Sequence, residues 1–396
     1  MIGEKRLNFN VMKKLVLAVT GIRSEYDIMS SVFRAIDNHP KLELNLAVTG
    51  AHLSENFGYT INEIENDGFK IVDHIESLLS GNKESLRVKG LGIQLQGLVQ
   101  TVLRIKPDFL LVLGDREESI ATALVSTYMN IPLVHISGGD RVIGNADDQI
   151  RHAVTKLAHI HLTTNLESRN RILALGEQKF RVHNVGNPGL DRMIKTKKLS
   201  NSQLSKNLNF NIHKNEPYII LIQHALSSEV SGAYEQMKTT LEAVKKMEIK
   251  TIISFPNSDA GGLEIIRAIS EYEEIPFIYS AKNIPRLEFV NLMRGAACLI
   301  GNSSAGILEA PLLKLPVINI GNRQKGRLHA QNVEFVSHNK SKIIRAIKKA
   351  VFDKEYIKKV QKCSNPYGDG KSSDRIAQIL ASVKIDENLL VKDITY

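Results

Sequence analysis

Short apolar runs alternate with segments of helical periodicity through the first half of the chain. The runs, each ending in a turn, are residues 13–21, 42–50, 108–115 and 132–140. A strand with one face in water would alternate apolar and polar residues, so unbroken runs predict strands that are covered on both faces. Helical segments between such strands are typical of a parallel sheet. The first half is therefore predicted to be an α/β domain.

The same rhythm begins again in the second half, after a polar stretch. Its apolar runs are residues 218–224, 250–256, 276–280, 297–304 and 316–321. We expect residues 12–192 and 216–369 to form two Rossmann-like domains, joined by a linker over residues 193–215. Domains of this length can each bury a core of their own. We expect residues 1–11 to be a disordered leader, because the apolar pattern starts only after Met12.

The charge balance is basic, because 52 Lys and Arg outnumber 42 Asp and Glu. The lysines gather in amphipathic stretches such as residues 342–354, and aromatic residues make up only 6% of the chain, which argues against nucleic-acid binding. A small anionic ligand fits the charge better. No apolar stretch approaches the roughly 20 residues of a membrane span. Two cysteines, Cys298 and Cys363, fit a reducing cytosol. We therefore expect a cytoplasmic protein without nucleic-acid or membrane partners.

Polar side chains follow five of the predicted strands. They are Arg23, Asp115, His224, Asn257 and Ser303. Each residue alone is also typical of a helix N-cap or a turn. In open parallel sheets, however, ligands bind beyond the carboxyl ends of the strands. Five polar residues at such ends, spread over both halves, therefore indicate one ligand site in a cleft between the two domains.

The sequence GNSSAGILEA, residues 301–310, predicts a phosphate site in the second half. Ser303 and Ser304 stand just before a helix, where free N–H groups and the positive helix end suit a diphosphate. Glu309, further along the same helix, is placed to accept both hydroxyls of a ribose, although a surface glutamate is the simpler explanation. Arg323 is a further partner for an anion. The chain has neither a Walker lysine motif nor a GxGxxG sequence after its first strand, which argues against a P-loop and a dinucleotide fold.

Carboxylates are dense between residues 115 and 148. Asp115 and Asp140 end two consecutive predicted strands, and Asp147 and Asp148 follow within a few residues. Carboxylates that share a closed site cannot all ionise equally, so we expect at least one to keep a raised pKa and act as an acid. The alternative is that Asp147 and Asp148 only stabilise the N-terminus of a helix.

Three histidines, His152, His159 and His161, raise the alternative of a metal site. They lie where a predicted helix passes into a strand, without a convincing set of ligands, and packed histidines are the commoner explanation. We therefore expect neither a metal nor another cofactor.

Six stretches together resemble one enzyme family over nearly the whole chain. They are TGIRSEYD, GDREES, DDQIRHAVTKLAH, FPNSDAG, IGNSSAG and NPYGDG. They are similar to the hydrolysing branch of the UDP-N-acetylglucosamine 2-epimerases. The resemblance implies the glycosyltransferase-B fold, in which two Rossmann-like domains face each other across a cleft. It also implies a C-terminal helix, residues 370–396 here, that crosses back to the first domain, and a homodimer or homotetramer.

The resemblance also assigns roles to individual residues. The nucleotide contacts that it implies are Arg23, Arg116, Ile284, Ser303, Ser304, Glu309 and Arg323. We add Asn257 to them because it follows a predicted strand. The implied catalytic carboxylates are Asp115 and Asp147, with His224 near the diphosphate. Ser137 stands where many members of the family have glutamate. Asp140 matches an acidic position that is common in the hydrolysing branch, and we expect it to take over the role of the missing glutamate.

The reaction implied by the resemblance removes UDP across C1–C2 of UDP-N-acetylglucosamine and adds water to the resulting 2-acetamidoglucal. The products are UDP and N-acetylmannosamine, for sialic acid synthesis. Three alternatives stay open. The substrate could be the UDP-linked 2,4-diacetamido-2,4,6-trideoxyglucose that leads to legionaminic acid. The protein could instead be a glycosyltransferase of the same fold. The protein could also be an inactive sensor of nucleotide sugars, because Ser137 replaces the glutamate of many family members.

Overall fold

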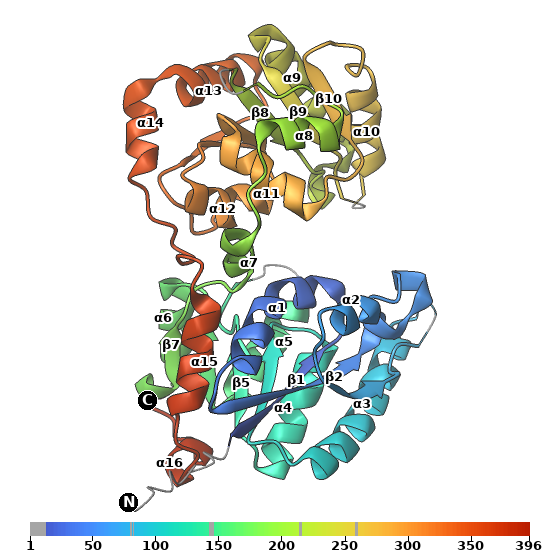
Figure 1. Ribbon diagram of the computed structural model, residues 1–396, viewed down its shortest axis with the longest axis vertical. Helices are drawn as coiled ribbons and strands as arrows, with labels where there is room; N and C mark the ends of the chain where they lie inside the picture. Colours follow the sequence, from blue (N-terminus) through green and yellow to red (C-terminus); the bar gives the residue numbers. More distant parts are fainter. Residues whose placement is uncertain (1–12, 80, 82, 142–145, 214–215, 258–259) are drawn as a thin grey trace, which may run out of the picture. The chain divides into compact units, whose positions relative to one another are not determined.

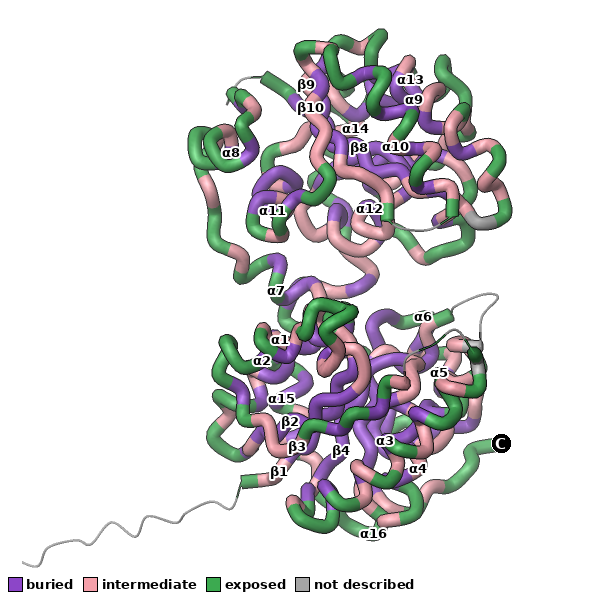
Figure 2. Tube along the Cα trace, turned by 90° about the vertical axis from the view of Figure 1, so that its right-hand side faces the viewer, coloured by how far each residue is buried: buried purple, intermediate pink, exposed green. Residues whose placement is uncertain are grey.

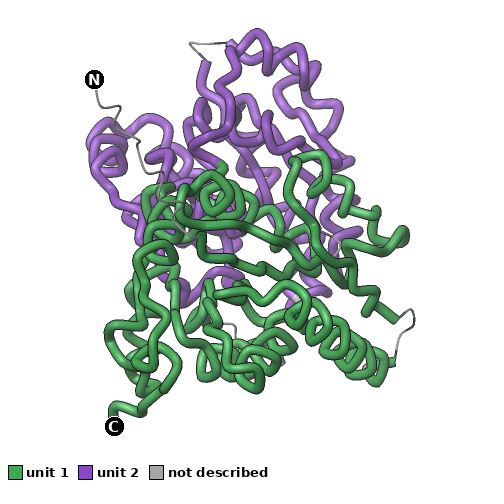
Figure 3. The backbone as a smooth tube through the Cα atoms, turned by 60° about the horizontal axis from the view of Figure 1, so that its bottom comes forward, with its two compact units in different colours: residues 1–192, 367–396 green, residues 193–366 purple. Residues whose placement is uncertain are grey.

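The computed structural model describes residues 13–79, 81, 83–141, 146–213, 216–257 and 260–396. The expected leader, residues 1–11, lies outside the described residues. The chain divides into two compact units, which Figure 3 colours separately. Unit 1 is Met1–Arg192 with Tyr367–Tyr396, and unit 2 is Met193–Pro366. Each unit holds one parallel sheet flanked by helices, so the prediction of two Rossmann-like α/β domains is confirmed.

Unit 1 contains a seven-stranded parallel sheet in the order β3-β2-β1-β4-β5-β6-β7. Its strands are β1 (Lys14–Thr20), β2 (Leu42–Thr49), β3 (Ile71–Ile75), β4 (Phe109–Leu113), β5 (Leu133–Ile136), β6 (Ile160–Thr163) and β7 (Val182–Asn184). Its helices are α1 (Arg23–Asp37), α2 (Ile61–Asn66), α3 (Glu84–Ile105), α4 (Glu117–Met129), α5 (Ala146–Leu157), α6 (Leu166–Ala174), α15 (Ser372–Ser382) and α16 (Glu387–Leu390). The boundary between the two units, after Arg192, falls within helix α7 (Gly189–Lys195).

The central strands of unit 1 are buried on both faces (Figure 2). In β1, Val16 and Ala18 belong to the core that also contains residues of α1 and α15, whereas Leu17 and Val19 point into the core with α3, α4 and α5. Successive side chains of a strand alternate between the two faces of a sheet. Two covered faces therefore require the unbroken apolar runs seen in the sequence.

Unit 2 contains a six-stranded parallel sheet in the order β10-β9-β8-β11-β12-β13. Its strands are β8 (Tyr218–Ile222), β9 (Lys250–Ser254), β10 (Ile278–Ala281), β11 (Cys298–Gly301), β12 (Val317–Ile320) and β13 (Val333–Val336). Its helices are α8 (Asn201–Leu208), α9 (Ala233–Met247), α10 (Gly262–Ser270), α11 (Arg286–Gly295), α12 (Ser304–Leu308), α13 (Lys340–Phe352) and α14 (Lys354–Gln361).

The polar stretch that we expected to be a linker contains helix α8. Ser200 caps this helix, because its side chain accepts a hydrogen bond from the N–H of Gln203 while the Gln203 side chain accepts one from the Ser200 N–H. Leu204 and Leu208 are buried in a core of unit 2. Two apolar residues four positions apart on one face are enough to pack a short helix, although the stretch reads as polar overall.

Residues 367–396 pack as part of unit 1. Ile376 and Leu380 of α15 are fully buried in the same core as residues of α1. The ammonium group of Lys14, at the start of β1, donates to the carbonyl oxygens of Leu380, Ala381 and Val383 at the end of α15. Within the part of the chain that the structure describes, no helix has the length and apolar character needed to span a membrane.

In both sheets the strand order reverses at one point. In unit 1 the reversal lies between β1 and β4, and in unit 2 it lies between β8 and β11. Open α/β sheets bind ligands beyond the carboxyl ends of the strands at such switch points. The two strand orders therefore mark two candidate ligand-binding edges, one in each unit.

Candidate functional site

The carboxyl edge of unit 1 is organised by an arginine that the sequence did not single out. The guanidinium group of Arg151, on α5, forms an ion pair with the carboxylate of Asp115, which follows β4. Arg151 Nη1 also donates to the carbonyl oxygen of Ser137 (3.2 Å) and lies 3.8 Å from Asp140 Oδ2. The side chains of Arg151 and Asp115 are only 11% and 15% exposed, so water screens the pair weakly. Arg151 thus joins the ends of β4 and β5.

The turn after β5 presents its backbone to Arg151. Ser137 has a φ of +62°, in the left-handed region that non-glycine residues rarely adopt. The next glycines are also constrained, because a Cβ on Gly139 would lie 2.6 Å from the carbonyl oxygen of Ser168. Strained backbone of this kind persists where the surrounding structure fixes it. Position 137 therefore contributes its backbone carbonyl oxygen to Arg151.

Asp140 is held in place by hydroxyl donors from the neighbouring strand and helix. Its Oδ1 accepts hydrogen bonds from Thr164 Oγ1 (2.8 Å) and Ser168 Oγ (2.5 Å). Burial raises the pKa of Asp140, although these hydrogen bonds and the charge of Arg151 oppose the increase. Burial consequently favours the protonated form of Asp140.

Asp147 lies in the first turn of α5 and is partly exposed. A carboxylate is stabilised at this end of a helix, because the first N–H groups point toward it. The neighbouring Asp148 is 3.7 Å from His152 Nε2, one turn along the helix. Helix α5 thus carries Asp147 in its first turn and Arg151 four residues further along.

Two buried glutamates, Glu25 and Glu118, lie near Arg116, and neither was predicted to belong to the site. Arg116 Nε lies 3.0 Å from Glu118 Oε1, and Glu25 Oε2 accepts a hydrogen bond from the N–H of Gly21 (3.1 Å). Burial and the charge of Glu118, which shares a hydrogen bond with Glu25, raise the pKa of Glu25 well above its usual value. A Cβ at position 21 would lie 2.6 Å from the Glu118 carboxyl carbon, so a larger residue there would displace this carboxylate. The sequence could have revealed this pair, because Glu25 and Glu118 each follow shortly after the end of a predicted strand.

A cavity of about 160 Å³ opens beside these residues in unit 1, and Arg116 and Glu118 line it. Gln94 of α3 also lines it, and this side chain is only 2% exposed. Among the described residues, Gln94 Nε2 has no hydrogen-bond partner. Leu78 and Leu91 add apolar surface. The cavity therefore offers an amide donor next to apolar carbon, at the ends of strands β1 to β4.

Arg23, a predicted phosphate contact, is the first residue of α1 and is exposed. Its Nε lies 3.2 Å from Glu63 Oε1 of α2. An exposed pair of this kind is weak, so the arginine can exchange its partner for a ligand at little cost.

His224 and Asn302 bridge the switch point of unit 2. Asn302 Oδ1 accepts from the N–H of His224 (2.7 Å), and Asn302 Nδ2 donates to the carbonyl oxygen of His224 (2.9 Å). The N–H of Asn257, after β9, donates to His224 Nδ1 (3.1 Å). A ring nitrogen that accepts carries no proton, so the neutral ring is protonated on Nε2. The structure therefore brings the predicted residues His224 and Asn257 together and makes Nε2–H a donor.

The predicted serines follow β11 directly. Ser303 caps α12, because its Oγ accepts from the N–H of Ala305 (3.3 Å), and Ser304 is the first residue of that helix. Arg323 Nη1 donates to the carbonyl oxygen of Asn302 (3.2 Å). Ser303, Ser304 and Arg323 thus gather around Asn302 at the end of one strand.

Glu309 ends α12 and pairs with an arginine that was not predicted. Arg286 Nη1, at the start of α11, lies 3.1 Å from both carboxylate oxygens of Glu309. Burial raises the pKa of Glu309, and Arg286 opposes that increase. Ile284, two residues before α11 begins, is 8% exposed and belongs to a core of unit 2.

The histidines that raised the metal alternative have protein partners. His159 Nδ1 accepts from the N–H of Leu133 (3.1 Å), and His161 Nε2 lies 3.1 Å from Glu177 Oε2. Burial lowers the pKa of both histidines. These neutral rings hold elements of unit 1 together.

The sequence and the fold match one family. The sequence model of the UDP-N-acetylglucosamine 2-epimerase family matches residues 34–381. The chain belongs to this family, as the resemblance of its motifs predicted, and the predicted enzyme class is confirmed with it.

Two relatives and one solved structure illustrate the match. The chain is 34% identical to a UDP-N,N'-diacetylbacillosamine 2-epimerase (hydrolyzing) of Legionella pneumophila, over 96% of this chain and 99% of the relative. It is 35% identical to a GDP/UDP-N,N'-diacetylbacillosamine 2-epimerase (hydrolyzing) of Campylobacter jejuni, over 81% of this chain and 84% of the relative. The UDP-GlcNAc 2-epimerase of Neisseria meningitidis, solved with UDP-GlcNAc, has the same fold with a TM-score of 0.75, at 21% identity over 92% of this chain and 99% of that one.

Proposed function

We propose that this enzyme hydrolyses a UDP-linked 2-acetamido sugar and inverts its configuration at C2. The observation that carries the proposal is the cluster at the edge of unit 1, where Asp115, Asp140 and Arg151 meet beside the first turn of α5. Membership of the epimerase family supports the assignment.

The reaction has two stages, elimination and hydration. A carboxylate takes the C2 proton while the C1–O bond breaks, so that the electrons form a C1=C2 double bond and UDP leaves with the oxygen. Water then adds its oxygen to C1 and gives one proton to a carboxylate base, while an acid returns a proton to C2 on the opposite face. Overall, the UDP-sugar and one water give UDP and the free 2-epimer. We assign the proton carriers to Asp115 and Asp147, with Asp140 as the third candidate.

The groups on unit 2 suit the nucleotide. The Nε2–H of His224 and the N–H groups after β11 at Ser303 and Ser304 can stabilise the charge of the leaving diphosphate. We assign Arg323 and Asn257 to the same diphosphate, Glu309 to the ribose and the backbone of Ile284 to the base. From unit 1, Arg23 and Arg116 supply cationic groups for the phosphates.

The sugar that we favour carries a second acetamido group at C4. Both of the relatives described above are named for N,N'-diacetylbacillosamine. The cavity beside Arg116 supports this choice, because Gln94 Nε2 can donate to an acyl oxygen while Leu78 and Leu91 cover the methyl group. UDP-N-acetylglucosamine, the substrate first implied by the sequence motifs, is the second candidate, because the Neisseria meningitidis enzyme of the same fold was solved with it.

Both UDP-sugars should be assayed in parallel in deuterated water. We expect UDP and the 2-epimeric sugar in equal amounts, with deuterium at C2, and a higher kcat/KM for the diacetamido sugar. Gln94→Leu should reduce that preference without affecting the other substrate. A product without solvent deuterium would rule out the elimination, and UDP release that requires an added acceptor would indicate a glycosyltransferase.

A further inference from the structure

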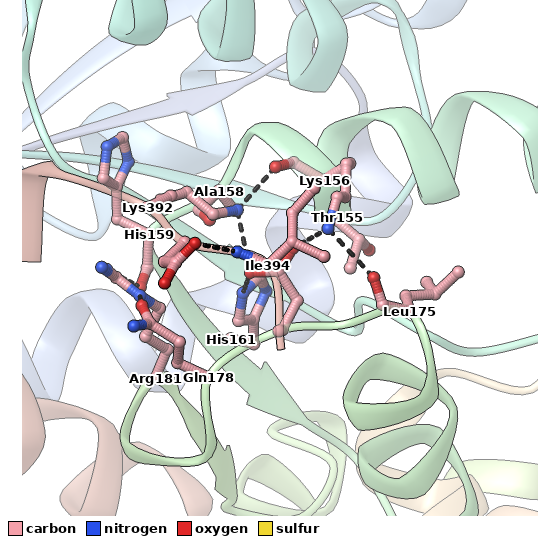
Figure 4. A network of polar contacts seen from close by, with 12 residues as sticks. Thr155, Lys156, Ala158, His159, His161, Leu175, Gln178, Arg181, Lys392 and Ile394 are labelled. Atoms are coloured by element: carbon pink, nitrogen blue, oxygen red, sulfur yellow. Dashed lines mark hydrogen bonds and ion pairs between the residues drawn. The ribbon is translucent and has the colours of Figure 1, made fainter. Parts of the chain in front are cut away.

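The last residues of the chain contact the end of helix α5 (Figure 4). Lys392 Nζ donates to the carbonyl oxygens of Lys156 (2.5 Å) and Ala158 (2.6 Å), where α5 finishes. The same ammonium group lies 2.9 Å from Glu177 Oε2. Its side chain is 20% exposed. One lysine therefore closes the C-terminal end of the helix that carries Asp147 in its first turn and Arg151 one turn further along.

Residues 389–395 are held in place on both sides of Lys392. Arg181, a fully buried side chain, donates to the carbonyl oxygens of Leu389 (2.6 Å) and Val391 (2.7 Å). Beyond Lys392, the N–H of Thr395 donates to the carbonyl oxygen of Gly176 (3.2 Å). The position of the Lys392 ammonium group is thus set by backbone contacts of the residues before and after Lys392, as well as by its own hydrogen bonds.

The charge of Lys392 is balanced within the same network. Glu177 also accepts from Lys156 Nζ (3.0 Å) and His161 Nε2 (3.1 Å). Burial alone would raise the pKa of Glu177, but the hydrogen bonds from His161 and Lys392 outweigh it and lower the pKa to about 2. Glu177 therefore stays ionised, and a cation beside it at the negative end of a helix is favourable.

We propose that Lys392 is a positioning residue for the reaction, because it anchors α5 and so fixes where Asp147 and Arg151 stand. This inference rests on the proposed function. Backbone hydrogen bonds run from turn to turn along α5, so a shift of its C-terminal end is passed on to the turns that carry Arg151 and Asp147. A misplacement of about 1 Å can cost up to about 10²-fold in rate. Binding should be spared, because the predicted diphosphate and ribose contacts are mostly on unit 2.

Lys392→Met removes the anchor, and Lys392→Arg keeps a cation with several donors. Lys14→Met is a matched control, because Lys14 closes the end of α15 through three carbonyl oxygens in the same way. We expect Lys392→Met to lower kcat about 10-fold or more, with KM changed about two-fold or less, and Lys392→Arg to restore most of kcat. Lys14→Met should lower the melting temperature without lowering kcat. Equal losses of kcat in both methionine variants, or no rescue by arginine, would overturn the proposal.

A second measurement does not depend on turnover. In Lys392→Met, the amide hydrogens of residues 146–157 should exchange faster than in wild type, whereas in Lys14→Met they should not. If the single variant fails to fold because Glu177 has lost one of its two lysine partners, Lys392→Met with Glu177→Gln removes both charges and permits the same comparison. Unchanged exchange in α5 would refute the anchor. A wild-type enzyme inactive on every UDP-sugar would instead refute the proposed function, and the exchange experiment would still decide whether Lys392 holds α5.

Discussion

The guanidinium group of Arg151 on α5 is paired with the carboxylate of Asp115 at the end of β4. The pair joins residues that are 36 positions apart in sequence and places the charge of Asp115 beside the turn of Asp140. An arginine in this position can orient one carboxylate while it leaves others available to move protons.

Arg151→Met should lower both activity and stability, because it leaves the Asp115 carboxylate without its cation. Breaking a fully buried pair from one side costs roughly 3–5 kcal/mol, so this partly exposed pair should cost less than that. Losing the electrostatic contact should reduce kcat about 10²-fold or more. Urea unfolding and steady-state kinetics measure the two effects. The double variant Arg151→Met with Asp115→Asn should recover much of the stability and none of the activity. Recovery of activity would show that the pair is not part of the reaction.

Asp147→Asn should reduce the rate about 10²- to 10⁴-fold and leave UDP affinity unchanged, because it removes a proton carrier and preserves the size of the side chain. Asp148→Asn is the matched control, since it removes the same charge from the same turn of α5. We expect the control to keep kcat within a few-fold of wild type. Similar losses in both variants would mean that the carboxylates act only on the helix end.

Glu25→Gln should change how stability depends on pH. The raised pKa of Glu25 means that the folded protein holds a proton that the unfolded chain loses near its usual pKa of about 4.3. The stability linked to Glu25 is therefore complete below that value and is lost as pH rises toward the folded-state pKa. Glutamine imitates the protonated group, so the free energy of unfolding of the variant, relative to wild type, should increase with pH. Urea unfolding between about pH 4 and pH 8 measures this.

The control for Glu25 is Glu43→Gln, which removes a surface carboxylate paired with Lys70 in the same unit. Its difference from wild type should depend little on pH, because exposed pairs contribute little. If Glu25→Gln and Glu43→Gln gave parallel curves, Glu25 would be ionised in the folded enzyme.

Glu309→Gln should weaken UDP binding by about 1–3 kcal/mol and leave binding of inorganic diphosphate nearly unchanged, because only the ribose contact is altered. Calorimetric titration with both ligands makes the comparison. Glu334→Gln, which removes a carboxylate paired with Lys349 elsewhere in unit 2, should affect neither ligand. If Glu309→Gln weakened both ligands equally, its pairing with Arg286 would be supporting the fold of the phosphate region instead.

The sequence was sufficient to predict the repeated parallel sheet and the family. Strands β1, β4, β8 and β11 are buried on both faces, so each is a continuous apolar run that can be recognised locally. Four strands were not among the predicted runs. One of them, β6, is an interior strand of only four residues that contains the polar His161 and Thr163. The other three, β3, β7 and β13, lie at sheet edges. Edge strands are short and partly exposed, and they carry polar residues such as Asp73 and His183, so their local pattern is weak.

The strand-end residues were also predictable, because a turn after an apolar run has a local signature. Their partners were not. Arg151, Arg286 and Lys392 are ordinary basic residues on helices or near the C-terminus, and nothing close to them in sequence distinguishes them from other basic residues. Glu25 and Glu118 become a pair only when β1 lies beside β4. Apolar periodicity is a property of neighbouring residues, whereas the pairing of charges depends on which distant strand ends and helix ends the packed core brings together.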